Sequence, residues 1–207
     1  MNNTKRMALI IAVVVVLFLV FRGGDSKVET TGLNTNAVIL AFGDSLTYGY
    51  GAVDQAYPQQ LETMVSRKVI NAGVSGEVSA VGLKRLPKLL AKYHPSLVIL
   101  CHGGNDILRR YSKENLKANL SKMIALSRKN GAQVLLVGVP GFGLFGLSTV
   151  PLYKELALEK HVLYEGAVLE VIENDPNLKS DRIHPNAIGY KVMAEAFTKL
   201  LHENGLI

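Results

Sequence analysis

Residues 37–47, AVILAFGDSLT, join a short apolar run to a glycine, an aspartate and a serine. The first six residues of this stretch have the length and composition of a buried β-strand. The polar residues that follow would then lie at the carboxyl end of the strand, where open parallel sheets place their ligand sites. The chain beyond residue 47 indicates whether the sheet is of that kind.

From residue 37 onward, short β-rich runs alternate with longer helical ones. The strand runs are AVILAF, KVIN, SLVILC and AQVLLVGV, and the helix runs after them are YPQQLETMVSR, EVSAVGLKRLPKLLAKY, SKENLKANLSKMIALSRK and PLYKELALEKH. We expect a fifth short strand at 162–164, an irregular stretch to residue 174, and a last helix at 186–202, since Pro185 disfavours helical geometry at His184. The alternation predicts an α/β fold, a three-layer sandwich around a mainly parallel five-stranded sheet.

The N-terminus carries an apolar run that belongs to a membrane rather than to a core. Met7 to Phe21 is uninterrupted by polar residues and follows Lys5 and Arg6. Its length suits a signal peptide or a short membrane span, so residues 1–25 are predicted to be one or the other. Arg22 directly after the run favours an uncleaved anchor, whereas Gly24-Asp25-Ser26 would serve as a cleavage site.

Residues 26–36, SKVETTGLNTN, are polar and lack an apolar period, so we expect a tether there. Residues 37–207 are long enough for one domain with its own core. The two basic residues before the apolar run predict that this domain lies outside the cytoplasm. It would be anchored to the membrane of a bacterial envelope, or be periplasmic or secreted if the leader is cleaved.

Composition and absent motifs exclude several classes of function. The net charge of +6 is not gathered into a basic stripe with interleaved aromatics, which speaks against nucleic-acid binding. The single cysteine, Cys101, allows no intramolecular disulfide and is expected in the core. No GxSxG, HExxH, GxxxxGK[ST] or GxGxxG motif with the required context is present, so no metal ion or nucleotide cofactor is implied.

Polar and glycine residues gather at four separate places, three of them after predicted strands and the fourth before the last predicted helix. Carboxyl ends of parallel strands meet at one edge of a sheet, so these segments should converge on a single site. The segments are Gly43-Asp44-Ser45-Leu46, Asn71-Ala72-Gly73, Gly103-Gly104-Asn105-Asp106 and Asp181-Arg182-Ile183-His184-Pro185.

This set of segments resembles the SGNH (GDSL) hydrolase superfamily. AFGDSLTYGYG, NAGVSGE, HGGND and DRIHPNAIGY are similar to its four sequence blocks in the right order, and the likeness extends over residues 37–207. Each motif alone is weak, but four in order at strand ends are a specific signal. The resemblance implies a flavodoxin-like order of the five strands. Spacing and flanking sequence look most like the bacterial group of acyl-thioesterases, lysophospholipases and arylesterases.

The resemblance also implies roles for five residues. Ser45 would be the nucleophile that forms an acyl-enzyme, and His184 would be its base, positioned by Asp181. The amides of Ser45 and Gly73 and the side chain of Asn105 would donate to the oxyanion. Physical reasons agree, since serine needs an adjacent base whose tautomer a carboxylate fixes, and oxyanion donors act on charge that develops only in the transition state.

Each of these residues also has a structural interpretation. Ser45 and Asn105 are residue types that often cap helices, and Gly73 could be an ordinary turn glycine. Asp181 and His184 could be an ion pair at the mouth of the last helix. The presence of all four blocks together favours the catalytic interpretation.

The remaining cysteine and histidines are weaker candidates. Cys101 and His102 are neighbours on a strand, so their side chains should point to opposite faces and cannot form a nucleophile–base pair. His94, His161 and His202 lie near predicted helix ends, where a solvated or capping imidazole is usual.

The stretch 141–150, GFGLFGLSTV, is too apolar for an ordinary exposed loop. Phe142, Leu144, Phe145 and Leu147 could line an acyl pocket, or simply pack beneath the loop. The pocket interpretation predicts hydrolysis of carboxylic esters or thioesters with a lipid-like acyl group, such as lysophospholipids. The alternatives are a carbohydrate O-acetylesterase acting on cell-wall or matrix sugars and a non-catalytic, membrane-tethered binding module.

Overall fold

The computed structural model describes residues 28–143 and 146–207. The predicted membrane segment at residues 1–25 lies outside the described residues. Within the two described ranges, none of the helices combines the length and the apolar character that crossing a bilayer requires.

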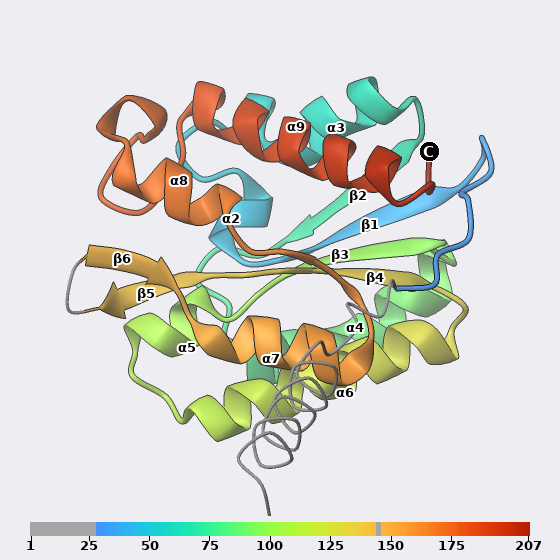
Figure 1. The fold of residues 1–207 in the computed structure, drawn as a ribbon, viewed down its shortest axis with the longest axis horizontal. Coiled ribbons are helices and arrows are strands. Elements are labelled where there is room, and N and C mark those ends of the chain that lie inside the picture. Colours follow the sequence, from blue (N-terminus) through green and yellow to red (C-terminus); the bar gives the residue numbers. More distant parts are fainter. Residues whose placement is uncertain (1–27, 144–145) are drawn as a thin grey trace, which may run out of the picture.

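Five parallel strands form the central sheet in the order β2-β1-β3-β4-β7 (Figure 1). This is the flavodoxin-like order, in which the chain reverses its direction of travel across the sheet between β1 and β3. The predicted α/β sandwich with a five-stranded parallel sheet is confirmed. The strands are β1 (Val38–Gly43), β2 (Lys68–Gly73), β3 (Leu97–Cys101), β4 (Gln133–Val137) and β7 (Leu163–Glu165).

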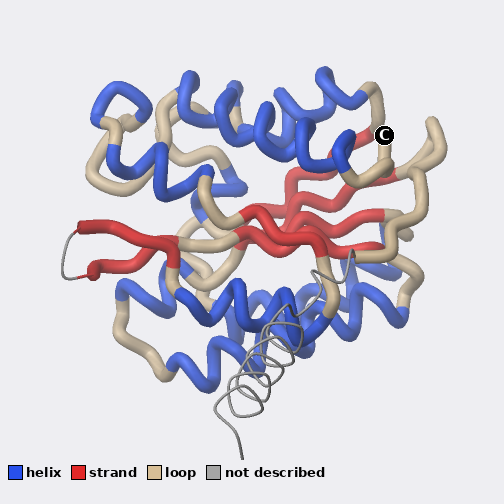
Figure 2. Tube along the Cα trace, viewed as in Figure 1, coloured by secondary structure: helices blue, strands red, loops and turns tan. Residues whose placement is uncertain are grey.

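Helices cover both faces of the sheet, as the colours of Figure 2 show most directly. One face carries α3 (Tyr57–Val65), α8 (Val168–Asn174) and α9 (Ala187–Glu203), and the other carries α4 (Ser79–Tyr93), α6 (Lys113–Lys129) and α7 (Pro151–Lys160). Short helical turns lie between these elements: α2 (Ser45–Tyr48), η1 (Val53–Gln55), α5 (Gly104–Leu108) and η2 (Pro176–Leu178).

The core is continuous because the middle strands are buried on both faces. Residues 39–42 of β1 and 97–101 of β3 are almost wholly inaccessible to water, which explains why both strands read as unbroken apolar runs. On the α3–α9 side, the rings of Tyr57 and Phe197 meet edge to face with centroids 5.1 Å apart. Burying each such large side chain contributes about 1.5–3 kcal/mol. Cys101 lies in this core, as predicted.

Side-chain caps begin two of the long helices. The Ser112 hydroxyl accepts from the Asn115 amide at the start of α6, and the Asn186 side chain accepts from two amides at the start of α9. Gly131, with a φ of 83°, turns the chain after α6. These caps involve only residues close in sequence, so they do not depend on distant contacts.

The predicted tether differs from what the structure shows. Residues 28–36 pack on the domain: the backbone of Thr31 makes two hydrogen bonds to the Gln133 side chain, and the Leu33 amide donates to the Leu206 carbonyl at 2.7 Å. Gln133 is the first residue of β4, so this contact lies at the amino-terminal edge of the sheet. The described chain therefore begins at the edge opposite to the strand ends that carry the predicted site (Figure 1).

Two further elements were not predicted. Where we expected a loop, β5 (Pro140–Gly143) and β6 (Gly146–Thr149) form an antiparallel hairpin that extends from the carboxyl edge of the sheet. Where we expected an irregular stretch, α8 forms and the Glu165 carboxylate accepts from the amides of Ala167 and Val168 at its start. That cap stands three residues before the helix and was not recognised.

Candidate active site

Ser45 is the first residue of α2 and follows β1 directly. The cap of this short helix is Asp44, whose carboxylate accepts from the Leu46 amide at 3.2 Å. Ser45 therefore does not take the capping role that the sequence left open. Its hydroxyl is instead directed to an imidazole from a distant part of the chain.

A row of hydrogen bonds joins the three residues predicted to form a triad. The Ser45 Oγ lies 3.1 Å from His184 Nε2, and His184 Nδ1 lies 2.8 Å from Asp181 Oδ2. The other carboxylate oxygen of Asp181 accepts from the amides of Ile183 and His184, at 2.8 Å each. The turn before α9 thus fixes both the carboxylate and the imidazole beside Ser45.

The electrostatics of this row favour an ionised carboxylate. Partial burial would raise the pKa of Asp181, but hydrogen bonds from the backbone of His184 and Ile183 and from the His184 ring lower it to about 2. An ionised Asp181 fixes the proton on His184 Nδ1 and leaves Nε2 free to accept from Ser45. The Tyr50 ring packs against the imidazole with centroids 4.4 Å apart, which restricts its rotation further.

Asn105 lies at the start of α5, after β3, and does not cap that helix. The cap residue is Gly103, and the Asn105 amide group donates to the Glu77 carbonyl at 3.1 Å and to Asp44 Oδ2 at 3.3 Å. Asn105 and Ser45 line the same pocket. The longer bond to Asp44 is the weaker one and could be exchanged for a bond to a substrate oxygen.

We expected the Gly73 amide to donate to the oxyanion, but the structure places Gly73 away from the pocket. Its amide donates to Asn71 Oδ1 at 3.0 Å, and its α-carbon packs so closely on the backbone of Tyr48 that a side chain would not fit. Gly73 lets α2 approach β2 and is not part of the pocket lining. Gly76, with a φ of 76°, does line the pocket, and its amide has no acceptor among the described residues.

A buried charged cluster that we did not predict supports the turn at Gly76. The Glu77 carboxylate binds Arg85 with distances from 2.7 to 2.9 Å and lies 3.1 Å from His102 Nε2. Arg85 also donates to the carbonyl of Ala72 at 2.8 Å, at the end of β2. The sequence did contain a sign of this cluster, because Arg85 lies three residues after the buried Gly82 and so falls on the buried side of α4.

Burial alone would raise the pKa of Glu77, but the hydrogen bonds from His102 and Arg85 hold it below its usual value. Glu77 is therefore ionised and stays bound to Arg85. Because the Glu77 carbonyl also accepts from Asn105, the cluster ties the segment after β2 to the segment after β3.

A pocket of about 670 Å³ opens beside Ser45, a size typical of sites for small organic ligands. One part of its lining, the reactive side, is Ser45, Gly76, Asn105 and His184. A second part, the hairpin side, is Val139, Pro140, Gly141, Leu147 and Glu173. Leu46, Ile107, Leu108 and Ile183 add further apolar surface.

The four predicted acyl-pocket residues have different outcomes. Leu147 lines the pocket, as expected. Leu144 and Phe145 lie outside the described residues, as does the side chain of Phe142. Glu173 was missed, because a glutamate in an amphipathic run gives no sign of pointing inward.

The lesser candidates lie where the sequence suggested. Cys101 is buried and His102 contacts Glu77, so the two form no nucleophile–base pair. His94 and His161 end α4 and α7, and His202 lies in the last turn of α9. In the described part of the chain, no group of three or more metal-ligating side chains is close enough to hold an ion.

The chain is similar in sequence and in fold to several known proteins. A family model described as GDSL-like Lipase/Acylhydrolase matches residues 41–192. An arylesterase of Vibrio mimicus is 32% identical over 168 residues, which cover 76% of this chain and 84% of the relative. Thioesterase 1/protease 1/lysophospholipase L1 of Escherichia coli K12 is 30% identical over 171 residues, 79% and 82% of the two chains. The crystal structure of TesA superposes with a TM-score of 0.73 at 30% identity, covering 81% of this chain and 99% of that one.

Proposed function

Because the chain belongs to the GDSL-like lipase/acylhydrolase family and is a serine esterase of the SGNH type, we propose that Ser45, His184 and Asp181 are its catalytic triad. Its substrates are carboxylic esters or thioesters with lipid-like acyl groups. The observation that supports this best is that Ser45 and the apolar side chains around Leu147 line one and the same pocket.

The reaction proceeds through an acyl-enzyme. Ser45 Oγ attacks the substrate carbonyl while His184 Nε2 takes the hydroxyl proton, and Asp181 stabilises the imidazolium that forms. Collapse of the tetrahedral intermediate breaks the bond to the alcohol or thiol, which leaves with that proton. A water molecule then repeats the attack on the acyl-enzyme, with His184 again as base, and releases the acid and free Ser45.

The oxyanion site is built from the reactive side. The amides of Ser45 and Gly76 and the side chain of Asn105 are its donors, with Gly76 replacing Gly73. Two observations support the exchange: Gly76 lines the pocket, and the Gly73 amide already donates to Asn71. Each such donor typically accounts for about 100- to 1,000-fold in rate.

The character of the pocket supports acyl chains over sugars. Its described lining includes no Phe, Tyr or Trp on which a sugar ring could stack, whereas seven lining residues are Leu, Ile, Val or Pro. Two relatives are named for arylesterase activity and for thioesterase and lysophospholipase activity. The carbohydrate O-acetylesterase is the weaker alternative, and membership of an esterase family removes the non-catalytic module.

A chain-length series tests this proposal. Wild type should hydrolyse p-nitrophenyl octanoate with a higher kcat/KM than the acetate, and acetylated sugars poorly. Leu147→Trp should reduce the octanoate rate about tenfold, because it fills the pocket, while leaving the acetate rate nearly unchanged. Leu158→Trp, at an exposed position of α7, is the matched control. A preference for acetylated sugars over octanoyl esters would contradict the proposal.

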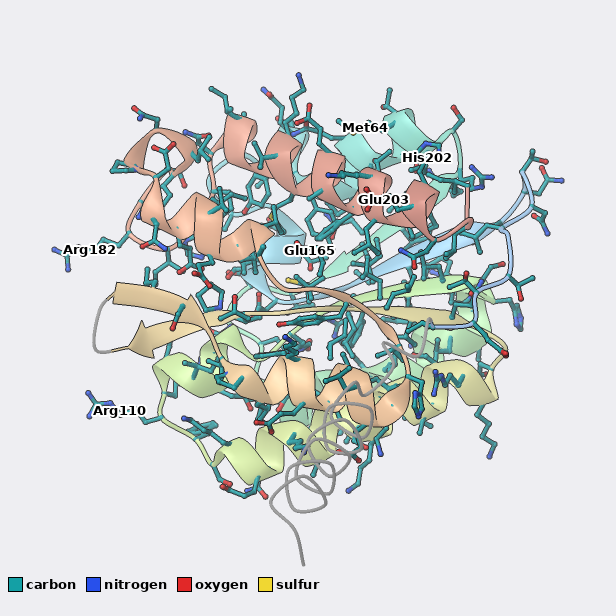
Figure 3. The ribbon with its side chains drawn as sticks, in the orientation of Figure 1. Met64, Arg110, Glu165, Arg182, His202 and Glu203 are labelled. Atoms are coloured by element: carbon teal, nitrogen blue, oxygen red, sulfur yellow. The ribbon has the colours of Figure 1, made fainter. Side chains whose placement is uncertain are left out.

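We further propose that residues 1–25 anchor the protein in a bacterial envelope membrane, with the domain outside the cytoplasm. The apolar run and Lys5-Arg6 support this. Since residues 28–36 dock at the opposite edge of the sheet, the pocket would open away from the anchoring bilayer. Arg182, which lines the pocket and projects outward in Figure 3, would then face incoming substrate.

Cell fractionation tests the anchor. The full-length protein should remain with membranes after salt extraction, whereas a chain that starts at Lys27 should be released and active. A mature N-terminus near Lys27, with activity free in the periplasm or medium, would instead indicate a cleaved signal peptide.

A further inference from the structure

The hairpin side of the pocket contains one carboxyl group that the proposed reaction does not use. Glu173, near the end of α8, is only 7% exposed and lines the same pocket as Ser45. Its neighbours in that part of the lining are Val139, Pro140 and Leu147. A carboxyl group among apolar side chains is unusual, because burial without a partner costs several kcal/mol.

Contacts between α8 and β6 hold Glu173 in this position. The Glu170 carboxylate accepts from the Thr149 amide at 2.9 Å, and the Asn174 side chain donates to the Leu147 carbonyl at 3.2 Å. Both bonds fasten the helix to the strand that carries Leu147. Because these bonds hold α8 at residues before and after Glu173, the side chain of Glu173 faces the pocket.

The carboxyl oxygens of Glu173 have no hydrogen-bond donor or cation within bonding distance among the described residues. Lys179, the nearest candidate, donates to the backbone carbonyl of Glu173 at 2.6 Å instead. The group is thus available to a ligand in the pocket.

The surroundings of Glu173 keep its two protonation states close in free energy. Burial raises the pKa of Glu173, the charge of Lys179 lowers it, and the charge of Asp44 raises it. The pKa of Glu173 is therefore about 7. β6 contributes no titratable side chain. On α9, burial raises the pKa of Tyr190 so that it stays neutral, and the charged residues are exposed pairs such as Lys191 with Glu195. Arg182, at the mouth, is exposed to solvent.

We propose that Glu173 makes this pocket select acyl chains that carry a hydroxyl group, an inference that rests on the proposed esterase function. A plain alkyl chain would displace water from the carboxyl group and offer it no partner, which is tolerable only for the neutral acid. An ammonium group would pair only with the carboxylate. A hydroxyl donates to the carboxylate and accepts from the neutral acid, so of these three groups it alone suits both states.

Paired substrates test the inference with the full-length protein. kcat/KM is measured from pH 5.5 to 8.5 for p-nitrophenyl octanoate and for octanoates with a hydroxyl at carbon three or at the chain end. Both kinds of ester use Ser45 and His184, so the ionisation of His184 cancels in the ratio of hydroxylated to plain substrate. For at least one hydroxyl position, this ratio should exceed one and rise with pH through 7, by up to about tenfold per pH unit.

Variants show whether Glu173 is responsible. Glu173→Gln keeps a hydrogen-bonding group that cannot ionise, so the ratio should stay above one and become independent of pH. Glu173→Leu should bring the ratio below one, and Glu195→Gln, on the exposed surface of α9, should behave as wild type. A wild-type ratio that is flat with pH and unchanged in Glu173→Gln would overturn the inference while leaving the esterase proposal intact. If wild type hydrolyses none of these esters, the proposed function fails as well.

Discussion

The two parts of the pocket lining differ in how their polar groups are satisfied. On the reactive side, Ser45 and His184 are joined by a hydrogen bond of 3.1 Å, and Asp181, behind the lining, holds His184 at 2.8 Å. On the hairpin side, the single carboxyl group of Glu173 has no partner among the described residues. A satisfied row of polar groups holds a geometry ready for chemistry, whereas a group without a protein partner can bond only to water or to a ligand in the pocket.

The carboxyl groups of Asp181 and Glu173 make the difference quantitative. Burial tends to raise the pKa of both groups. At Asp181 the hydrogen bonds outweigh it and the pKa falls to about 2, whereas at Glu173 burial prevails and the pKa rises to about 7. Surroundings rather than residue type therefore separate the two pKa values, in the direction that the proposed roles of Asp181 in catalysis and Glu173 in selection require. Changes on the reactive side should alter rate, and changes on the hairpin side should alter preference and stability.

Substitution of the proposed nucleophile is the strongest test of this division. Ser45→Ala should lower kcat/KM for p-nitrophenyl octanoate at least about 1,000-fold, since no attack can occur without the hydroxyl. The melting temperature should change little, because the hydroxyl contributes little packing. Ser148→Ala, at an exposed position of β6, is the matched control. Residual activity above about 1% of wild type, with contamination excluded, would show that Ser45 is not the nucleophile.

Removing an oxyanion donor should have the next largest effect. Asn105→Ala should reduce kcat about 100- to 1,000-fold with KM nearly unchanged, because the donor acts on charge present only in the transition state. Steady-state kinetics with octanoate separate the two constants, and Asn130→Ala at the end of α6 serves as control. A change confined to KM would make Asn105 a substrate-binding residue instead.

Much of the fold could be predicted because its signals are local. The central strands are buried on both faces and so appear as apolar runs. The caps at Ser112 and Asn186 bond to amides only two or three residues further along the chain. The hairpin and α8 could not be predicted in this way. They are short, and α8 is held by side-chain bonds from Glu170 and Asn174 to β6, which become visible only once the chain has folded.

The site shows the same limit at the level of single residues. Ser45 and Asn105 stand in short motifs after β1 and β3, Asp181 and His184 stand in a motif before α9, and the structure brings the four together. Gly73 ends β2 and Gly76 follows three residues later, and the sequence alone did not indicate which of the two faces the pocket. That choice depends on the turn at Gly76, and the inward position of Glu173 depends likewise on contacts between elements.

Stability offers a test of the hairpin side without any substrate. A carboxyl group whose pKa is raised from 4.5 to about 7 on folding destabilises the protein as pH rises between those values. Glu173→Gln removes this ionisation, so it should match wild type near pH 4 and exceed it by up to about 3 kcal/mol at pH 8. Urea unfolding at the two pH values measures the difference, with Glu195→Gln as control. Equal stability at pH 8 would mean that Glu173 is not held in a desolvated site.

The reactive side should show the opposite sign and a smaller effect. The pKa of Asp181 is lowered from 3.8 to about 2 on folding, so its contribution is complete above pH 4 and is lost as pH falls through 2. The side chain is 44% exposed, and solvent screening should keep this contribution below about 1 kcal/mol. Asp181→Asn cannot ionise, so between pH 4 and pH 2 its melting temperature should fall less steeply than that of wild type. Asp54→Asn, an exposed aspartate on η1, controls for the general loss of a negative charge. If both variants followed the wild-type curve, the hydrogen bonds around Asp181 would not stabilise its ionised form, and the contrast between the two carboxyl groups would be lost.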